Sequence, residues 1–146
     1  MRRLPRWLGV AGLIPQILLV AIEMGERPIF GPAARGLALA YAALILSFIG
    51  GTWWGFASQA GERAPPWLWF AAVLPSLIAF AALAACAVAW SPAPSLLVTG
   101  AALIAALRID FKLAKEGLCP PGWLSLRMPL SLGLGGLCIF IAVTIP

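Results

Sequence analysis

Residues 64–107 read APPWLWFAAVLPSLIAFAALAACAVAWSPAPSLLVTGAALIAAL and contain no charged side chain. A helix needs about 20 mainly apolar residues to cross the hydrocarbon core of a bilayer, so this stretch is long enough for two crossings. The segment Ser91-Pro92-Ala93-Pro94 divides it, because a proline lacks a backbone N–H and restricts the residue before it. The stretch therefore predicts two membrane-spanning helices joined by a short turn.

Composition extends this interpretation to the whole chain. Hydrophobic residues make up 62% of the 146 residues and charged residues 10%, compared with about 45–50% and about 25% in soluble domains. A water-soluble protein of this size could not bury so much apolar surface. We expect an all-α fold, a single transmembrane domain over residues 1–146 that forms one bundle of five transmembrane helices. The predicted spans are about 7–22, 36–57, 67–90, 95–111 and 126–145.

The basic residues predict the orientation, because Lys and Arg collect in cytoplasmic loops. With the N-terminus in the cytoplasm and the C-terminus outside, only Arg27 and Arg35 of the ten basic residues are external. The cytoplasmic ones are Arg2, Arg3, Arg6, Arg63, Arg108, Lys112, Lys115 and Arg127. The net charge of +5 is thus a topology signal without a compact basic patch, so no nucleic-acid partner is expected. We expect a multi-pass protein of the bacterial inner membrane.

An alternative for the first 22 residues is a signal peptide, since an arginine-rich start precedes an apolar stretch. Val20-Ala21-Ile22 is a poor small-residue cleavage site. We therefore favour a retained first span.

Two predicted spans begin with the same pattern. Residues 7–16 (WLGVAGLIPQ) and 67–76 (WLWFAAVLPS) share Trp, Leu, Ala and Pro in register, and a polar residue follows each proline. At about 1.5 Å per residue both prolines lie about 12 Å from the cytoplasmic interface. Each would leave the carbonyl four residues earlier, at Ala11 or Ala71, without its helical partner. The pattern favours kinks that help packing, or a site for a lipid or another apolar ligand. The candidate residues of that site are Pro15, Gln16, Trp53, Trp54, Pro75 and Ser76.

The second span carries small residues at every fourth position, namely Ala43, Ser47, Gly51 and Gly55. Residues four apart share one helix face, so these four predict a smooth ridge that another helix can approach closely. We expect the partner helix to belong to this chain. The alternative is a docking face for another subunit.

The inventory of reactive side chains argues against catalysis. The chain contains no histidine, and Cys86, Cys119 and Cys138 form no CxxC pair, so neither a metal site nor a cofactor is expected. No glycine-rich phosphate loop or catalytic carboxylate pair occurs. Arg108 and Asp110 are the charges nearest the membrane. We expect Arg108 to reach the headgroups and Asp110 to meet Lys112, Arg63 or Arg127.

Several of these segments also occur, in the same order, in a known family. They are residues 8–15, residues 41–55, Leu74-Pro75-Ser76-Leu77, Asp110 followed by basic residues, and Trp123 with Leu126-Arg127. Together they resemble the DUF3429 family of small membrane proteins, which includes the transmembrane protein 69 group, over nearly the whole chain. The resemblance implies a small multi-span membrane protein and no particular biochemical activity.

These observations favour a protein that is not an enzyme. We expect an accessory, assembly or stabilising subunit of a larger membrane complex, such as an energy-converting one, in contact with the lipid bilayer. The alternative is a binder or facilitator of a lipid or a quinone-like apolar small molecule.

The orientation can be tested with the native thiol of Cys119, which lies in the loop predicted to be cytoplasmic. A membrane-impermeant maleimide should label Cys119 only when the cytoplasmic face is exposed. Cys86 and Cys138, within predicted spans, should react slowly from either side and serve as internal controls. Rapid labelling of Cys119 in intact cells would reverse the predicted orientation.

Overall fold

The structure is a computed structural model that describes residues 7, 9–25, 31–89 and 91–144. Over these residues it is built from helices and contains no strand, which confirms the predicted all-α class. The elements are α2 (Ile14–Glu23), α3 (Gly31–Ala60), the short 3₁₀ helix η1 (Gly61–Arg63), α4 (Pro66–Ala89), α5 (Pro92–Ala105), α6 (Leu107–Lys115) and α7 (Trp123–Thr144). Four of the basic residues used for the orientation, Arg2, Arg3, Arg6 and Arg27, lie outside the described residues.

Three helices of the described chain are long and apolar enough to cross a membrane: Ala33–Arg63, Pro66–Ala89 and Trp123–Thr144. They correspond to the predicted spans 36–57, 67–90 and 126–145. The predicted span 7–22 corresponds to the shorter apolar helix Gly9–Glu23, and the span 95–111 to α5 and the start of α6. The number of five spans and their orientation therefore stay predictions.

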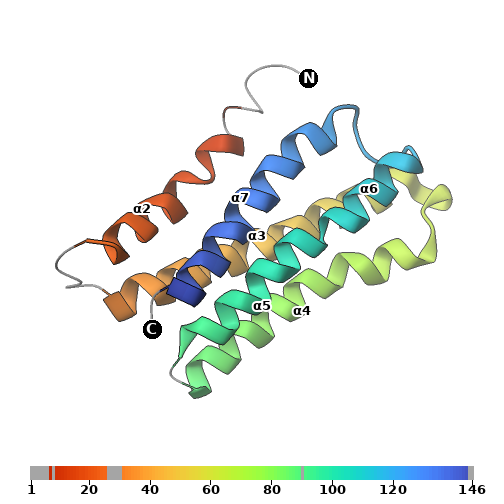
Figure 1. Ribbon diagram of the computed structural model, residues 1–146. Coiled ribbons are helices and arrows are strands. Elements are labelled where there is room, and N and C mark those ends of the chain that lie inside the picture. The colour runs from red at the N-terminus through yellow and green to blue at the C-terminus, as the bar shows by residue number, and fades with distance from the viewer. Residues whose placement is uncertain (1–6, 8, 26–30, 90, 145–146) are drawn as a thin grey trace.

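The long helices lie side by side, and α6 continues α5 along nearly the same line (Figure 1). Helix α3 contacts α2, α4 and α5, and α5 packs on α7. Large apolar side chains cover much of the outside, including Phe70 and Phe80 of α4 and Phe48 of α3. An apolar exterior of this kind suits a bundle that is surrounded by lipid tails.

Helices α3 and α4 approach each other closely at Gly50. A Cβ atom at Gly50 would overlap the carbonyl oxygen of Ala72 and would lie 3.3 Å from Cγ of Pro75. One turn before Gly50, the hydroxyl oxygens of Ser47 and Ser76 lie 2.8 Å apart and form a hydrogen bond between the two helices. Glycine at position 50 thus allows the backbones to touch, which is the usual way membrane helices associate when lipid is as apolar as their side chains.

Helices α5 and α7 use the same device at Gly100 and Gly135. A Cβ atom on either glycine would lie 2.8 Å from the carbonyl oxygen of the other. Such a distance is shorter than a normal van der Waals contact, so neither position has room for a side chain. The second pair of long segments is therefore also fixed by direct backbone contact.

The first predicted span is interrupted within the turn that precedes its proline. Turns at Gly12 and Leu13 separate residues 9–11 from α2, and Pro15 lies in the first turn of α2, where its missing N–H is tolerated. The hydroxyl of Tyr41 on α3 donates a hydrogen bond to the Gly12 carbonyl at this break. The distortion at Gly12 and Leu13 thus lies within one turn before Pro15 of the apolar helix Gly9–Glu23, whereas Pro75 lies inside α4.

The predicted ridge on α3 is divided between two environments. Ala43 is buried and Ser47 bonds to Ser76, as an internal contact requires. Gly51 and Gly55 are exposed, and a Cβ atom on either would have nothing of the described chain within 4 Å. The expected internal partner is therefore absent at these two glycines, and the close contact is made by their neighbour Gly50.

The neighbouring positions 50 and 51 give a matched test of this packing. Gly50→Ala should lower the free energy of unfolding by about 1–3 kcal/mol, because the new methyl group overpacks the contact with α4. Gly51→Ala adds the same group in open space and should leave stability unchanged or raise it by up to about 1 kcal/mol. Denaturant unfolding of the purified chain in detergent micelles measures both. Equal effects of the two substitutions would contradict the α3–α4 contact.

Candidate functional site

The carboxylate of Asp110 is the most deeply buried charge of the described chain, with an exposed fraction of 0%. Its Oδ1 atom accepts hydrogen bonds from Nε1 of Trp53 at 2.9 Å and from Nε1 of Trp123 at 2.8 Å. Its Oδ2 atom accepts a bond from Nε of Arg127 at 3.0 Å. A buried carboxylate is tolerated only when it is paired and hydrogen-bonded, and Asp110 meets both conditions.

The four residues come from three parts of the fold. Asp110 lies in the first turn of α6, Trp53 on α3, and Trp123 and Arg127 one turn apart at the start of α7. We call this set the Asp110 cluster. It joins α3, α6 and α7 at the end of the bundle that also carries the 116–122 loop.

Asp110, Lys112 and Arg108 each have a different environment in the structure. Of the three candidates for Asp110, Arg127 is the one that pairs with it. Lys112 instead places its Nζ atom 3.7 Å from the ring centroid of Trp67, a cation–π contact at the N-terminal end of α4. Arg108 is exposed, in agreement with a side chain that reaches the headgroups.

A cavity of about 390 Å³ lies between α3 and α7, next to the Asp110 cluster. This volume falls within the range of about 300–1,000 Å³ that is typical of small-molecule sites. The N-terminal segment closes one side and α5 contributes Leu103. The lining residues are Gly9, Gly12, Leu13, Ile45, Phe48, Ile49, Thr52, Leu103, Trp123, Leu126, Arg127, Leu130, Ser131 and Leu134.

Two polar residues of the cavity wall, Arg127 and Ser131, follow the Asp110 cluster along α7, and we call this part of the cavity its polar end. Arg127 and Ser131 lie one turn apart on the same face of α7, and both are buried. The Nη2 atom of Arg127 and the Oγ atom of Ser131 have no hydrogen-bond partner within the described parts of the chain. The Thr52 hydroxyl, in contrast, donates to the Ile49 carbonyl at 2.7 Å. Two residues of a mainly apolar cavity wall thus each carry a buried polar atom that has no hydrogen-bond partner in the described chain.

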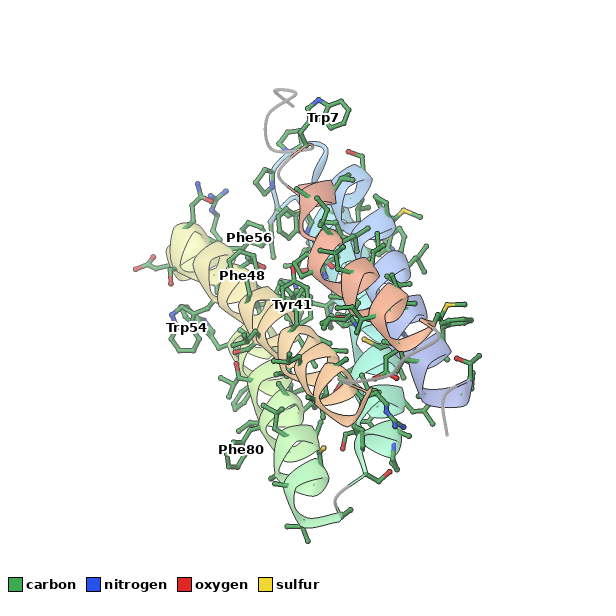
Figure 2. The ribbon with its side chains drawn as sticks, turned by 90° about the vertical axis from the view of Figure 1, so that its left-hand side faces the viewer. Trp7, Tyr41, Phe48, Trp54, Phe56 and Phe80 are labelled. Atoms are coloured by element: carbon green, nitrogen blue, oxygen red, sulfur yellow. The ribbon has the colours of Figure 1, made fainter. Side chains whose placement is uncertain are left out.

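The cavity reaches the outer surface of the bundle on the side of α2. Phe48 lines it and yet is 67% exposed. Figure 2 shows Tyr41, Phe48 and Phe56 on the side of α3 that faces α2, whereas Trp54 and Phe80 point to the opposite side. Because Phe48 belongs to both the cavity wall and the exposed surface of the bundle, the cavity reaches that surface beside Phe48.

The structure distributes the six residues of the predicted ligand site over several contacts. Trp53 bonds to Asp110 and, like Pro75, lines a smaller cavity of about 200 Å³ between α3, α4 and α5. Ser76 bonds to Ser47. Three other residues of the set, Pro15 at the start of α2, Gln16 and Trp54, lie apart from these, and none of the six lines the larger cavity.

Gln16 and Trp54 have contacts of different kinds. The fully buried Gln16 donates from Nε2 to Sγ of Cys138 over 3.5 Å, and its Oε1 atom has no partner in the described chain. Trp54 is half exposed and meets Trp69 edge to face, with ring centroids 4.8 Å apart. Pro15 and Pro75 were expected at the same depth in the membrane, but the polar residues that follow them, Gln16 and Ser76, do not contact each other and have different partners.

Sequence reasoning missed Arg127 and Ser131 as cavity residues. Their spacing of four was a usable signal, because two polar side chains on one face near the start of an apolar helix must meet either protein or a bound group. Gly9 and Gly12 were also missed. They line the cavity because residues 9–13 pack on α7, where a Cβ atom at Gly9 would lie 2.5 Å from Cδ1 of Leu126.

The chemistry of the described residues offers few reactive groups. They contain no cluster of three or more potential metal ligands. Burial raises the pKa of the Cys119 thiol in the 116–122 loop, and the negative charge of Asp110 raises it further. At a given pH the thiolate fraction of Cys119 is therefore smaller than that of an unperturbed cysteine, and the thiolate is the form that reacts with electrophiles.

Comparisons with known proteins agree with the helical, apolar architecture. The chain is 38% identical over 79 residues to a protein named transmembrane protein 69 from Xenopus tropicalis. The match covers 53% of this chain and 31% of that relative, so the chain spans about a third of the relative's length. No solved structure matches the chain. The family described as protein of unknown function (DUF3429) matches residues 1–144, and the chain belongs to this family.

Proposed function

We propose that this membrane protein binds an amphiphilic small molecule, a lipid or a quinone-like compound, in the cavity between α3 and α7. The role is binding or facilitation and involves no catalysed reaction. The proposal places the chain in a bacterial inner membrane with five spans and a cytoplasmic N-terminus. In that orientation the Asp110 cluster lies near the cytoplasmic surface and the cavity extends from it into the bilayer.

The observation that carries this proposal is the unused hydrogen-bonding capacity of Arg127 and Ser131. A buried polar group without a partner costs about 1–3 kcal/mol, and a charged one costs more. Nη2 of Arg127 and Oγ of Ser131 both lack a partner in the described chain and belong to residues that line the cavity. A bound molecule with a polar head would satisfy both groups while its apolar part occupies the remaining volume.

The lateral opening supports a ligand that arrives from the bilayer. An amphiphile dissolved in the membrane can enter beside Phe48 without crossing water. Glycines at positions 9 and 12 keep the covering segment thin at the cavity wall. Entry from lipid explains why the opening lies on an apolar face of the bundle.

A role as an accessory subunit of a larger membrane complex is the second candidate. It is favoured by Gly51 and Gly55, which leave an exposed, smooth strip on α3 of the kind that lets a helix of another subunit approach closely. These glycines do not line the cavity, so the two roles are separable. Migration of the protein as a lone chain after solubilisation in mild detergent would contradict the accessory role.

Ligand binding predicts different effects for two neighbouring leucines of α7. Leu130 lines the cavity, whereas Leu132 is exposed and does not. Leu130→Phe should lower the amount of lipid or quinone that copurifies from native membranes, because the larger ring occupies ligand volume. Leu132→Phe makes the same chemical change on the lipid-facing side and should leave that amount unchanged.

Mass spectrometry of the extracted small molecules, normalised to protein, measures the effect. Both variants should unfold at temperatures close to that of the parent chain, which shows that any loss reflects the cavity. Equal ligand content in the parent chain and Leu130→Phe would contradict binding at this site.

A further inference from the structure

We infer that the cavity recognises a neutral head group with a hydrogen-bond acceptor, such as the carbonyl of an ester or a quinone, and discriminates against anionic heads. This inference rests on the proposed function and specifies its ligand class. It follows from the charge balance of the site, from its donors, and from the position of the polar end relative to the apolar walls.

The charge of Arg127 is already balanced. Its Nε atom lies 3.0 Å from Oδ2 of Asp110, and among the described residues that line the cavity Arg127 is the one with a charge. An anionic head beside Arg127 would therefore leave a net charge of −1 in a buried, apolar environment, where uncompensated charge is strongly disfavoured. A neutral head keeps the Asp110–Arg127 pair balanced.

The free groups at the polar end act mainly as donors. A guanidinium nitrogen such as Nη2 of Arg127 can only donate, and the Ser131 hydroxyl can donate or accept. The Trp123 indole also lines the cavity, but its N–H is already used by Asp110. A ligand that satisfies Arg127 must therefore present an acceptor oxygen, which hydrocarbon does not have.

The polar end and the apolar walls follow one another along the helices. Arg127 and Ser131 are one and two turns from the start of α7 at Trp123, or about 6 and 12 Å along its axis. Beyond them the walls are apolar, with Leu134 on α7 and Ile45 on α3. This order suits a head held just below the interface and a hydrocarbon part that points toward the middle of the bilayer.

Four probes test the inference with the delipidated chain of residues 1–146 in mild detergent. Three of the probes carry hydrocarbon chains of similar length and differ in the head. Methyl hexadecanoate has a neutral ester that accepts hydrogen bonds, hexadecanoate at pH 9 has an anionic carboxylate, and hexadecane has no polar head. Decylubiquinone supplies the second source of a neutral carbonyl. The measurement is the amount of each probe retained per chain after gel filtration.

We expect the ester, the quinone or both to be retained at least tenfold more than hexadecanoate and hexadecane. The relative retention of ester and quinone then distinguishes a lipid-type from a quinone-type ligand. Ser131→Ala should reduce retention of the preferred probe by about 2- to 10-fold, the usual effect of one lost hydrogen bond. Ser125→Ala is the matched control, because Ser125 is exposed on the same helix and bonds to the Gly122 carbonyl.

Three outcomes would overturn the inference. Preferential retention of hexadecanoate would show an anion site, and equal retention of hexadecane would show that the head is not recognised. Either result would leave the proposed binding function standing. Retention of none of the four probes by the folded parent chain would contradict the proposed function itself, and the inference with it.

Discussion

The buried carboxylate of Asp110 is the constraint on which the arrangement of the polar end depends. Removed from water, it must keep its three N–H donors, from Trp53, Trp123 and Arg127, within bonding distance. Charge-assisted hydrogen bonds of this kind are short and directional, so they fix α3, α6 and α7 relative to one another. They also hold Arg127 by one edge, with Nε toward Asp110, and leave Nη2 without a partner in the described chain. The same interaction that stabilises the bundle thus prepares the polar end of the cavity.

Backbone contacts set the rest of the geometry. Lipid gives membrane helices little hydrophobic reason to associate, so close van der Waals contact must hold them together. Gly50 supplies that contact between α3 and α4, and Gly100 with Gly135 between α5 and α7. Helices α3 and α7 meet each other much less, and the cavity lies between them. The larger cavity is therefore the space between two tightly packed helix pairs, α3 with α4 and α5 with α7. The Asp110 cluster closes one end of it, and residues 9–13 close one side.

Apolar runs and prolines were sufficient to predict the helical class and the positions of the three long helices. The pairing of Asp110 with Arg127 was also within reach, because a membrane-proximal charge needs a partner and few were available. The two tryptophan donors and the cavity were not predictable in this way, because they depend on how α3 and α7 rotate about their axes. That rotation is set by single glycines: a ridge centred on Gly51 and one centred on Gly50 differ by one residue, or about 100° around a helix. For the same reason the proline pattern suggested one site from Gln16 and Ser76, which in fact contact Cys138 and Ser47.

Asp110 and Arg127 stabilise the bundle as a coupled pair, and a double-mutant cycle measures that coupling. Unfolding free energies are needed for the parent chain, Asp110→Asn, Arg127→Met and the double variant in the same detergent. Each single substitution leaves one buried charge uncompensated and should cost about 3–5 kcal/mol, whereas the double substitution removes both charges. We expect the double variant to lose at least about 1 kcal/mol less stability than the sum of the two single losses. Losses that add within about 0.5 kcal/mol would show that Asp110 and Arg127 are not coupled.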